Sequence, residues 1–126
     1  MNLLDLLLIG FLTLIGIFEF ISNTIVLFTK NFEWAKKIHQ LELPKNATER
    51  EIRNKVFRMF LLGLGINLSL LMGFINSSIL TSCIVFNASL ILFMGWLDYW
   101  YSRLGYPLLI WTIIGVIYYL FGVFSS

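Results

Sequence analysis

Long apolar segments separated by short polar ones dominate the sequence. The longest extends from Met59 to Leu97, 39 residues without a charged side chain. A straight helix of that length would extend roughly 58 Å, about twice the ~30 Å hydrocarbon core of a bilayer. The segment must therefore fold back, and the Asn-Ser-Ser sequence at 76–78 supplies side chains that stabilise a tight turn. We expect two membrane-spanning helices here, at about 56–75 and 78–98.

Two further apolar segments flank this pair. The first covers about 3–29 and has neither a basic region before it nor a small-residue cleavage site after it, so we expect a retained helix rather than a signal peptide. The last covers about 106–124, with Pro107 in the first helical turn, where proline is favoured. The pattern predicts an all-α, polytopic membrane protein, with four transmembrane helices in a compact bundle that forms a single membrane domain over residues 1–126.

The distribution of basic residues predicts the topology. The polar segment from Lys30 to Arg58 holds eight of the nine Lys and Arg residues, and Arg103 lies between the third and fourth predicted spans. Four spans place both segments on the same side of the membrane. The positive-inside rule then predicts that the loop at about 30–55 is cytoplasmic and that both termini lie outside.

The polar loop carries two local helix signals. Trp34, Ile38 and Leu41 recur at helical spacing, which predicts a short amphipathic helix on the lipid headgroups that Pro44 ends. Thr48 and Glu51 form a capping-box pattern, so the second long helix should begin near residue 49. An ordinary solvated connector, basic because of the topology alone, is the alternative interpretation of the loop.

Composition supports a membrane protein and narrows the chemistry. Hydrophobic residues make up 59% of the chain and charged residues 13%, about half the share typical of soluble domains, and the mean hydropathy is +0.86. A net charge of +2 argues against a nucleic-acid binder. With Cys83 and His39 as the only cysteine and histidine, we expect no internal disulfide, no metal centre and no cofactor.

Polar and small residues share one stripe of the first predicted helix. The stripe contains Asp5, Gly16, Glu19 and Asn23, and Glu19 lies a few residues beyond the midpoint of the span. An ionised carboxylate that faces hydrocarbon costs several kcal/mol by most estimates. Glu19 is therefore either a proton- or cation-responsive group in an internal cavity, with Asn23 as its partner, or a structural carboxyl that bonds another helix. The sequence leaves both interpretations open.

Ion pairs inside the membrane are not expected. The basic residues nearest the spans, Lys30, Arg58 and Arg103, stand at helix ends, so no base is expected to meet Glu19 at depth. We expect Glu19 to be protonated or reached by cytoplasmic water. Asp98, at the cytoplasmic edge of the third span, is expected to pair with Arg103.

Small residues mark faces for close helix packing. They recur at four-residue steps in the second span, at seven-residue steps in the third, and along one stripe of the fourth. The predicted packing residues are Gly65, Ser69, Gly73, Thr81, Ala88, Gly95, Gly115 and Gly122. The pattern does not distinguish a neighbouring helix of the same chain from a second protomer.

Aromatic residues gather where the third span meets the cytoplasm. They are Trp96, Tyr99, Trp100, Tyr101 and Tyr106. Such clusters are typical of the interfacial belt of membrane proteins. The alternative is an aromatic cage for a lipid or quinone ligand.

The layout resembles the DoxX-like group of small four-helix membrane proteins. The resemblance rests on Gly16 in the first span, the Leu-Glu-Leu-Pro sequence at 41–44, the sequence at 58–63 that opens the second span, and Pro107 at the start of the fourth. It implies the four-helix architecture and an association with redox, quinone-linked or stress systems. The chain has Glu19 where that group usually carries a basic residue, so no active-site residue is carried over.

These features predict an interaction protein rather than an enzyme. No histidine lies in a span to activate a serine, and no glycine-rich loop with a lysine offers a phosphate site. We expect a small accessory protein of a bacterial inner membrane, an immunity, defence or stress component that assembles with itself or a membrane protein partner through its small-residue faces. The alternative is an oligomeric ion channel or proton-coupled carrier that uses the Glu19 stripe.

Overall fold

The computed structural model describes the backbone of residues 3–125 and the side-chain surroundings of residues 3, 7 and 9–120. Within this part, every regular element is helical. The elements are α1 (Leu3–Thr29), α2 (Phe32–Ile38), α3 (Glu49–Ile75), the short 3-10 helix η1 (Ser77–Ile79), α4 (Leu80–Ser102) and α5 (Gly105–Ser125). The prediction of an all-α fold is confirmed.

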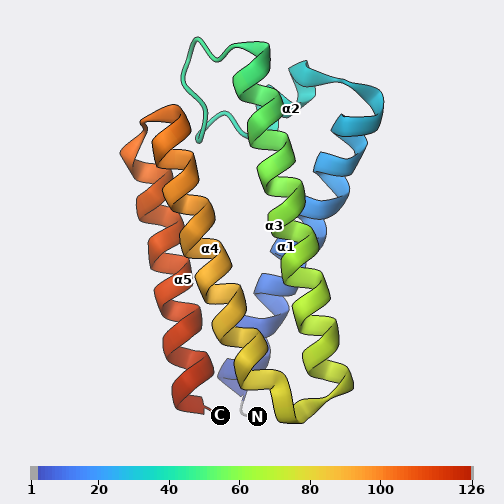
Figure 1. Ribbon diagram of the computed structural model, residues 1–126, viewed down its shortest axis with the longest axis vertical. Coiled ribbons are helices and arrows are strands. Elements are labelled where there is room, and N and C mark those ends of the chain that lie inside the picture. The colour runs from blue at the N-terminus through green and yellow to red at the C-terminus, as the bar shows by residue number, and fades with distance from the viewer. Residues whose placement is uncertain (1–2, 126) are drawn as a thin grey trace.

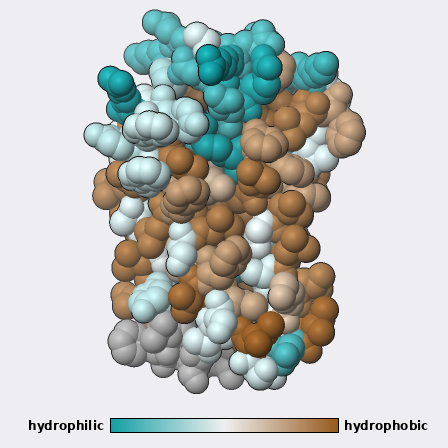
Figure 2. Space-filling view, viewed as in Figure 1, coloured by the Kyte–Doolittle hydropathy of each residue, from teal (hydrophilic) through white to brown (hydrophobic). Residues whose placement is uncertain are grey.

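Three of the helices are long and apolar enough to cross a membrane. They are the described part of α1 (Ile9–Thr29), α3, and η1 with α4 (Ser77–Ser102), while the described part of α5 (Gly105–Leu120) is a shorter apolar helix. Side chains on the outside of these helices are mostly apolar, and polar ones gather at the end that carries α2 (Figure 2). This is the distribution expected of helices that face lipid.

The long helices pack as one bundle (Figure 1). α1 packs against α3, α3 against α4, and α4 against α5, while α1 and α5 touch only slightly. The two chain ends lie at one end of the bundle, and α2 with its loop covers the other. We call this covered end the loop side.

Local sequence signals set the ends of α3. Thr48 Oγ1 accepts a hydrogen bond from Glu51 N at 3.3 Å, and Glu51 Oε1 accepts one from Thr48 N at 3.4 Å, which forms the predicted capping box. At the other end Asn76 Oδ1 accepts hydrogen bonds from Ser78 N and Oγ, so the chain turns into α4 where predicted. Both predictions are confirmed.

The helix in the loop is shorter than predicted. α2 ends at Ile38 instead of continuing to Pro44, and Leu41 is 65% exposed rather than aligned with Trp34 on an apolar face. The chain leaves the helix at His39 because His39 and Glu42 turn inward and bond the bundle.

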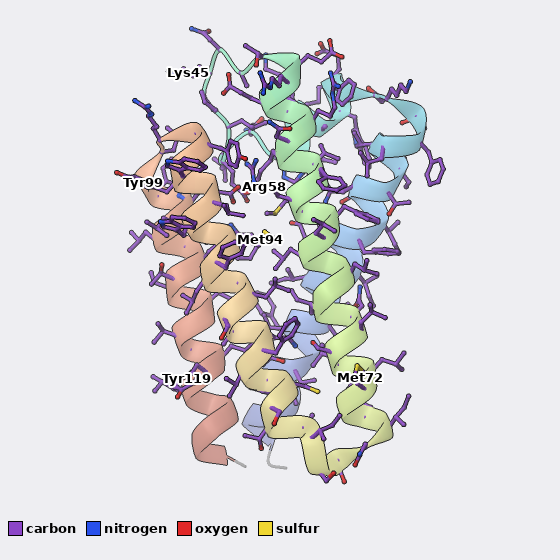
Figure 3. The ribbon with its side chains drawn as sticks, viewed as in Figure 1. Lys45, Arg58, Met72, Met94, Tyr99 and Tyr119 are labelled. Atoms are coloured by element: carbon purple, nitrogen blue, oxygen red, sulfur yellow. The ribbon has the colours of Figure 1, made fainter. Side chains whose placement is uncertain are left out.

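Most of the bundle interior is apolar. Its core contains Leu12 from α1, Leu62 and Ile66 from α3, Ile91 from α4 and Tyr118 from α5, all at most 1% exposed. A second, smaller apolar cluster lies under the loop, around Val26, Leu43 and Val56. Arg58 and Met94 point into the space between α3 and α4, whereas Lys45 and Tyr119 point outward (Figure 3).

Candidate functional site

Charged side chains replace apolar ones inside the loop side of the bundle. Because α3 begins at Glu49, its second and third turns bring Lys55 and Arg58 beside the end of α4. Lys55 Nζ donates to Asp98 Oδ2 at 2.5 Å, and Arg58 donates to Asp98 Oδ1 from Nε at 3.1 Å and from Nη2 at 2.9 Å. Lys55 and Asp98 are 0% exposed and Arg58 is 8% exposed. These are buried ion pairs.

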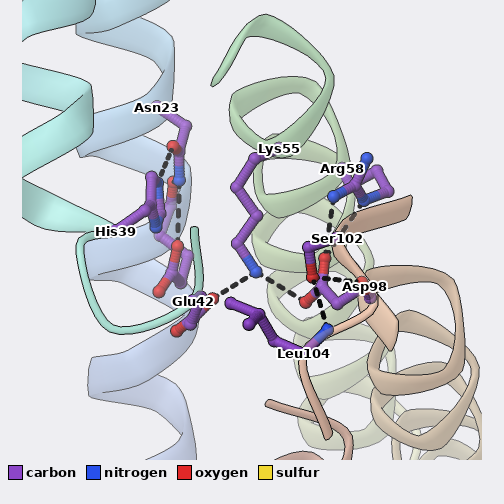
Figure 4. A network of polar contacts seen from close by, with 9 residues as sticks. Asn23, His39, Glu42, Lys55, Arg58, Asp98, Ser102 and Leu104 are labelled. Atoms are coloured by element: carbon purple, nitrogen blue, oxygen red, sulfur yellow. Dashed lines mark hydrogen bonds and ion pairs between the residues drawn. The ribbon is translucent and has the colours of Figure 1, made fainter. Parts of the chain in front are cut away.

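The loop adds a second carboxylate to this site. The turn after α2 descends into the mouth of the bundle, and the Glu42 carboxylate forms an ion pair with Lys55 (Figure 4). Leu43, the next residue, is 7% exposed in the small apolar cluster. The loop is therefore held down by an ion pair and by apolar packing together.

A chain of hydrogen bonds ties the same turn to α1. Asn23 Nδ2 donates to Glu19 Oε2 at 2.9 Å, which leaves Asn23 Oδ1 to accept from His39 Nε2 at 2.9 Å. His39 Nε2 must carry hydrogen in this arrangement, because an amide oxygen accepts only. All three residues are buried, with Asn23 0% exposed.

His39 is an uncharged imidazole in this site. Burial, together with the positive charges of Lys55 and Arg58, lowers its pKa from 6.5 to about 3. At neutral pH the ring therefore supplies a hydrogen-bond donor and no positive charge.

These groups form one cluster, since Glu19 lies within electrostatic reach of Glu42, Lys55 and Asp98. We call it the loop-side cluster. Its members are Glu19, Asn23, His39, Glu42, Lys55, Arg58 and Asp98 (Figure 4). It contains three carboxyl groups, two basic side chains and a neutral histidine, so ionisation of all three carboxyl groups would leave one negative charge unbalanced.

Two sequence predictions about this end were wrong. Asp98 pairs with Lys55 and Arg58 rather than with Arg103, which is exposed and ends α4 in a left-handed conformation with φ of 57°. A base does approach Glu19, because Lys55 is buried inside the bundle and not at a lipid-facing helix end. The first error arose because Arg58 and Lys55 lie 40 and 43 residues before Asp98 in the sequence. The second arose because the base that approaches Glu19 belongs to a different helix, α3.

Four of the five predicted aromatic residues lie on α4 and are exposed, whereas Tyr106 lies at the start of α5. The rings of Trp96 and Trp100 stack with centroids 6.3 Å apart and planes 2° apart, and Tyr101 meets Trp100 edge-on at 5.5 Å. The Arg58 guanidinium carbon lies 4.6 Å from the centroid of the Tyr101 ring, a cation–π contact. Tyr99 and Tyr106 are also exposed. The exposed rings gather at the loop-side ends of α4 and α5, the placement that an interfacial belt requires.

Several predicted packing residues make contacts within the chain. A Cβ on Gly65 would lie 2.5 Å from Leu90, one on Gly95 2.7 Å from Trp111, and one on Gly115 2.8 Å from Leu92. Gly73 approaches Leu80 in the same way, and Ala88 is 1% exposed. Thr81 is exposed. The side-chain surroundings of Asp5 and Gly122 lie outside the described residues.

A close backbone approach of α1 and α3 involves a glycine that the sequence patterns did not single out. A Cβ on Gly63 would lie 2.5 Å from the backbone nitrogen of Phe20 and 2.8 Å from the carbonyl oxygen of Gly16. Gly16, predicted as part of the polar stripe, therefore serves the contact of α1 with α3. Four-residue steps from Gly65 could not reveal this, because Gly63 lies on another face of α3.

A small polar group crosses the apolar half of the bundle. Ser69 on α3 hydrogen-bonds Asn87 on α4, and Asn87 Nδ2 donates to Tyr118 Oη on α5 at 3.3 Å. Such bonds hold transmembrane helices together at modest strength. Ser69 thus acts through its hydroxyl as well as through its small size.

Among the residues described, no group of three or more His, Cys, Asp or Glu side chains could hold a metal ion. Comparisons with known protein families, with curated proteins and with solved structures found no match for this chain. The resemblance to DoxX-like proteins therefore stays a prediction.

Proposed function

We propose that this chain is a four-span protein of a bacterial inner membrane, and that it acts as an accessory protein by presenting the loop between α1 and α3 to a partner. Three helices long enough to cross a membrane, followed by the apolar α5, support four spans. The concentration of basic residues on the loop side supports a cytoplasmic loop with both chain ends outside.

The observation that carries this proposal is the division of charge at the loop side. Lys55 and Arg58 point inward and bind carboxylates. The other basic residues are exposed: Lys30, Lys36, Lys37, Lys45, Arg50, Arg53 and Arg103. Glu33 and Glu49 are exposed acids and Glu51 is half-buried, so the outer surface is strongly positive. A basic surface on a fixed scaffold attracts an acidic partner segment.

The filled interior argues against conduction through a single copy. Leu12, Met59, Ile66 and Ile91 are at most 1% exposed and occupy the centre of the bundle between the loop-side cluster and the opposite end. Among the described residues, these side chains interrupt any polar path through the centre of the bundle. The small-residue contacts that could serve an oligomer are also occupied within the chain, at Gly95 and Gly115.

Site-specific photo-crosslinking in bacterial cells tests this function. A photoreactive residue at exposed Lys37 should give one discrete protein adduct, and the same residue at Phe86, on the apolar outer face, should give none. Lys36→Glu should abolish the adduct, whereas Ser89→Ala, on the exposed face of α4, should leave it unchanged. Equal adducts at both positions, or an adduct insensitive to Lys36→Glu, would contradict the proposal.

The unbalanced carboxyl group of the loop-side cluster favours a second candidate, an oligomeric proton-coupled carrier. Reconstituted protein would then move protons across liposomes, and Glu19→Gln would abolish the flux while the protein still assembles. Absence of flux from wild-type protein would exclude this candidate.

A further inference from the structure

The charges of the loop-side cluster balance with one carboxyl group neutral. Lys55 and Arg58 supply two positive charges, and Glu42 and Asp98 supply two negative ones. His39 is neutral, so an ionised Glu19 would leave one buried negative charge without a partner. An uncompensated buried charge is strongly unfavourable. The docked arrangement is therefore balanced when Glu19 holds a proton.

When the turn from His39 to Glu42 lifts out of the bundle, the charge balance favours the ionised form of Glu19 instead of the protonated form. His39 and Glu42 lie on the same turn, so both leave the bundle when the turn lifts. Lys55 and Arg58 would then face Asp98 alone, with Glu19 as the remaining carboxyl group in reach. The open arrangement is balanced when Glu19 is ionised. Asp98 thus supplies one negative charge in both states. Glu42 supplies the second when the turn is docked, and Glu19 supplies it when the turn is open.

We propose that Glu19 is a proton-binding site coupled to docking of the turn from His39 to Glu42. Docking places Glu42 on Lys55 and a proton from loop-side water on the Glu19 carboxylate; undocking returns that proton to the water. This inference rests on the proposed function, because the turn belongs to the loop that would meet the partner. Proton concentration would then regulate the presented surface.

His39 gives docking a second pH dependence of opposite sign. The pKa of His39 is about 3 in the docked state and returns towards 6.5 when the ring is in water, so below about pH 6.5 the free turn binds a proton that the docked turn does not. Acid therefore favours release through His39, whereas alkali favours release through Glu19. Docking should be greatest at an intermediate pH.

The remaining groups around Glu19 are included in this balance. They are His39 and Glu42 on the turn, Lys55 and Arg58 on α3, and Asp98 on α4, with the Tyr101 phenol ring outside Arg58. Among the described residues, the hydrogen bonds and ion pairs of the cluster involve no side chain of α5. We thus assign the loss of docking at high pH to Glu19 and the loss of docking at low pH to His39.

Distances measured by electron paramagnetic resonance between the turn and the end of α4 test whether docking of the turn is coupled to proton binding. Spin labels at exposed Gln40 and Arg103, in a Cys83→Ala background, would report the docked population of purified protein in nanodiscs from about pH 5 to about pH 9. The docked-to-open ratio should fall on both sides of a maximum, by up to about tenfold per pH unit for one proton. A ratio that is constant over this range would overturn the proposal.

Variants of the two titrating residues separate the loss of docking at high pH from the loss at low pH. Glu19→Gln should remove the alkaline loss, and His39→Gln, which can still donate to Asn23, should remove only the acid loss. Glu42→Gln provides a second test if Glu19→Gln does not fold, because docking then adds no negative charge and the alkaline loss should vanish. Persistence of the alkaline loss in either glutamate variant would contradict the coupling. No partner is present in this experiment, so its failure is separate from failure of the crosslinking test.

Discussion

In the half of the bundle that holds the chain ends, helices contact one another mainly through apolar side chains and glycines, whereas on the loop side buried charges are added to a small apolar cluster. The apolar half distributes its contacts over many residues, such as Leu62, Ile66 and Ile91, and each can be changed with local effect. The loop-side cluster concentrates its contacts on Lys55 and Asp98, which satisfy each other. Many apolar residues therefore contribute to stability in the half that holds the chain ends, whereas stability on the loop side depends on a few charged residues that need one another.

Removal of one charged partner should have the largest effect. Lys55→Met leaves Asp98 and Glu42 without their shared cation and should destabilise the protein by about 3–5 kcal/mol. Thermal unfolding in mild detergent measures the change.

The matched control is Arg53→Gln two residues earlier. Its contact with Glu49 is 3.8 Å long and lies between side chains that are 60% and 68% exposed, so stability should change by less than about 0.5 kcal/mol. If the two variants lost equal stability, the loop-side cluster would not be interdependent.

A methyl group added at Gly63 tests the close backbone contact between α1 and α3. Gly63→Ala places a Cβ against the backbone of Phe20 and Gly16, neither of which can rotate away, and should cost about 1–3 kcal/mol. Gly10→Ala is the control, because among the described residues no atom outside its own stretch of helix lies within 4 Å of its Cβ. The better helix propensity of alanine should leave stability equal or higher by up to about 1 kcal/mol. The opposite order of effects would refute the close approach of α1 and α3.

The polar contact in the apolar half should have the smallest effect. Asn87→Leu removes the hydrogen bonds to Ser69 and Tyr118 and should cost about 1 kcal/mol, since each bond between transmembrane helices is worth about 0.6 kcal/mol on average. Ser89→Ala, which loses only a bond to its own helix carbonyl, should cost less still. A loss as large as that of Lys55→Met would show that the two halves do not differ in kind.

Sequence patterns predicted the features that local signals control. Thr48 and Glu51 are three residues apart, and the turn at 76–78 bonds within itself, so each was readable from a few neighbouring residues. Apolar length alone predicted the long helices. The loop-side cluster was not predictable in this way, because Asp98 meets Arg58 and Lys55 across 40 and 43 residues.

The sequence also gave no signal for the roles of His39 and Glu42. Both lie on a segment with helical spacing, which predicted that the helix would continue. Their bonds to Asn23 and Lys55 turn the chain inward instead, and tertiary contacts of this kind override a weak local pattern. Glu19 and Asn23 lie one helical turn apart, so their contact could be predicted from local spacing. In the structure Asn23 Nδ2 lies 2.9 Å from Glu19 Oε2.

The separation of Lys55 from Asp98 bears on how the protein is made. Synthesis proceeds from the amino end, so Lys55 and Arg58 leave the ribosome about forty residues before the acid that neutralises them. A nascent chain that ends before α4 should keep the start of α3 in water and mature only when Asp98 arrives. In a truncated or stalled product Glu42 could still pair with Lys55, but Arg58 would lack its carboxylate partner.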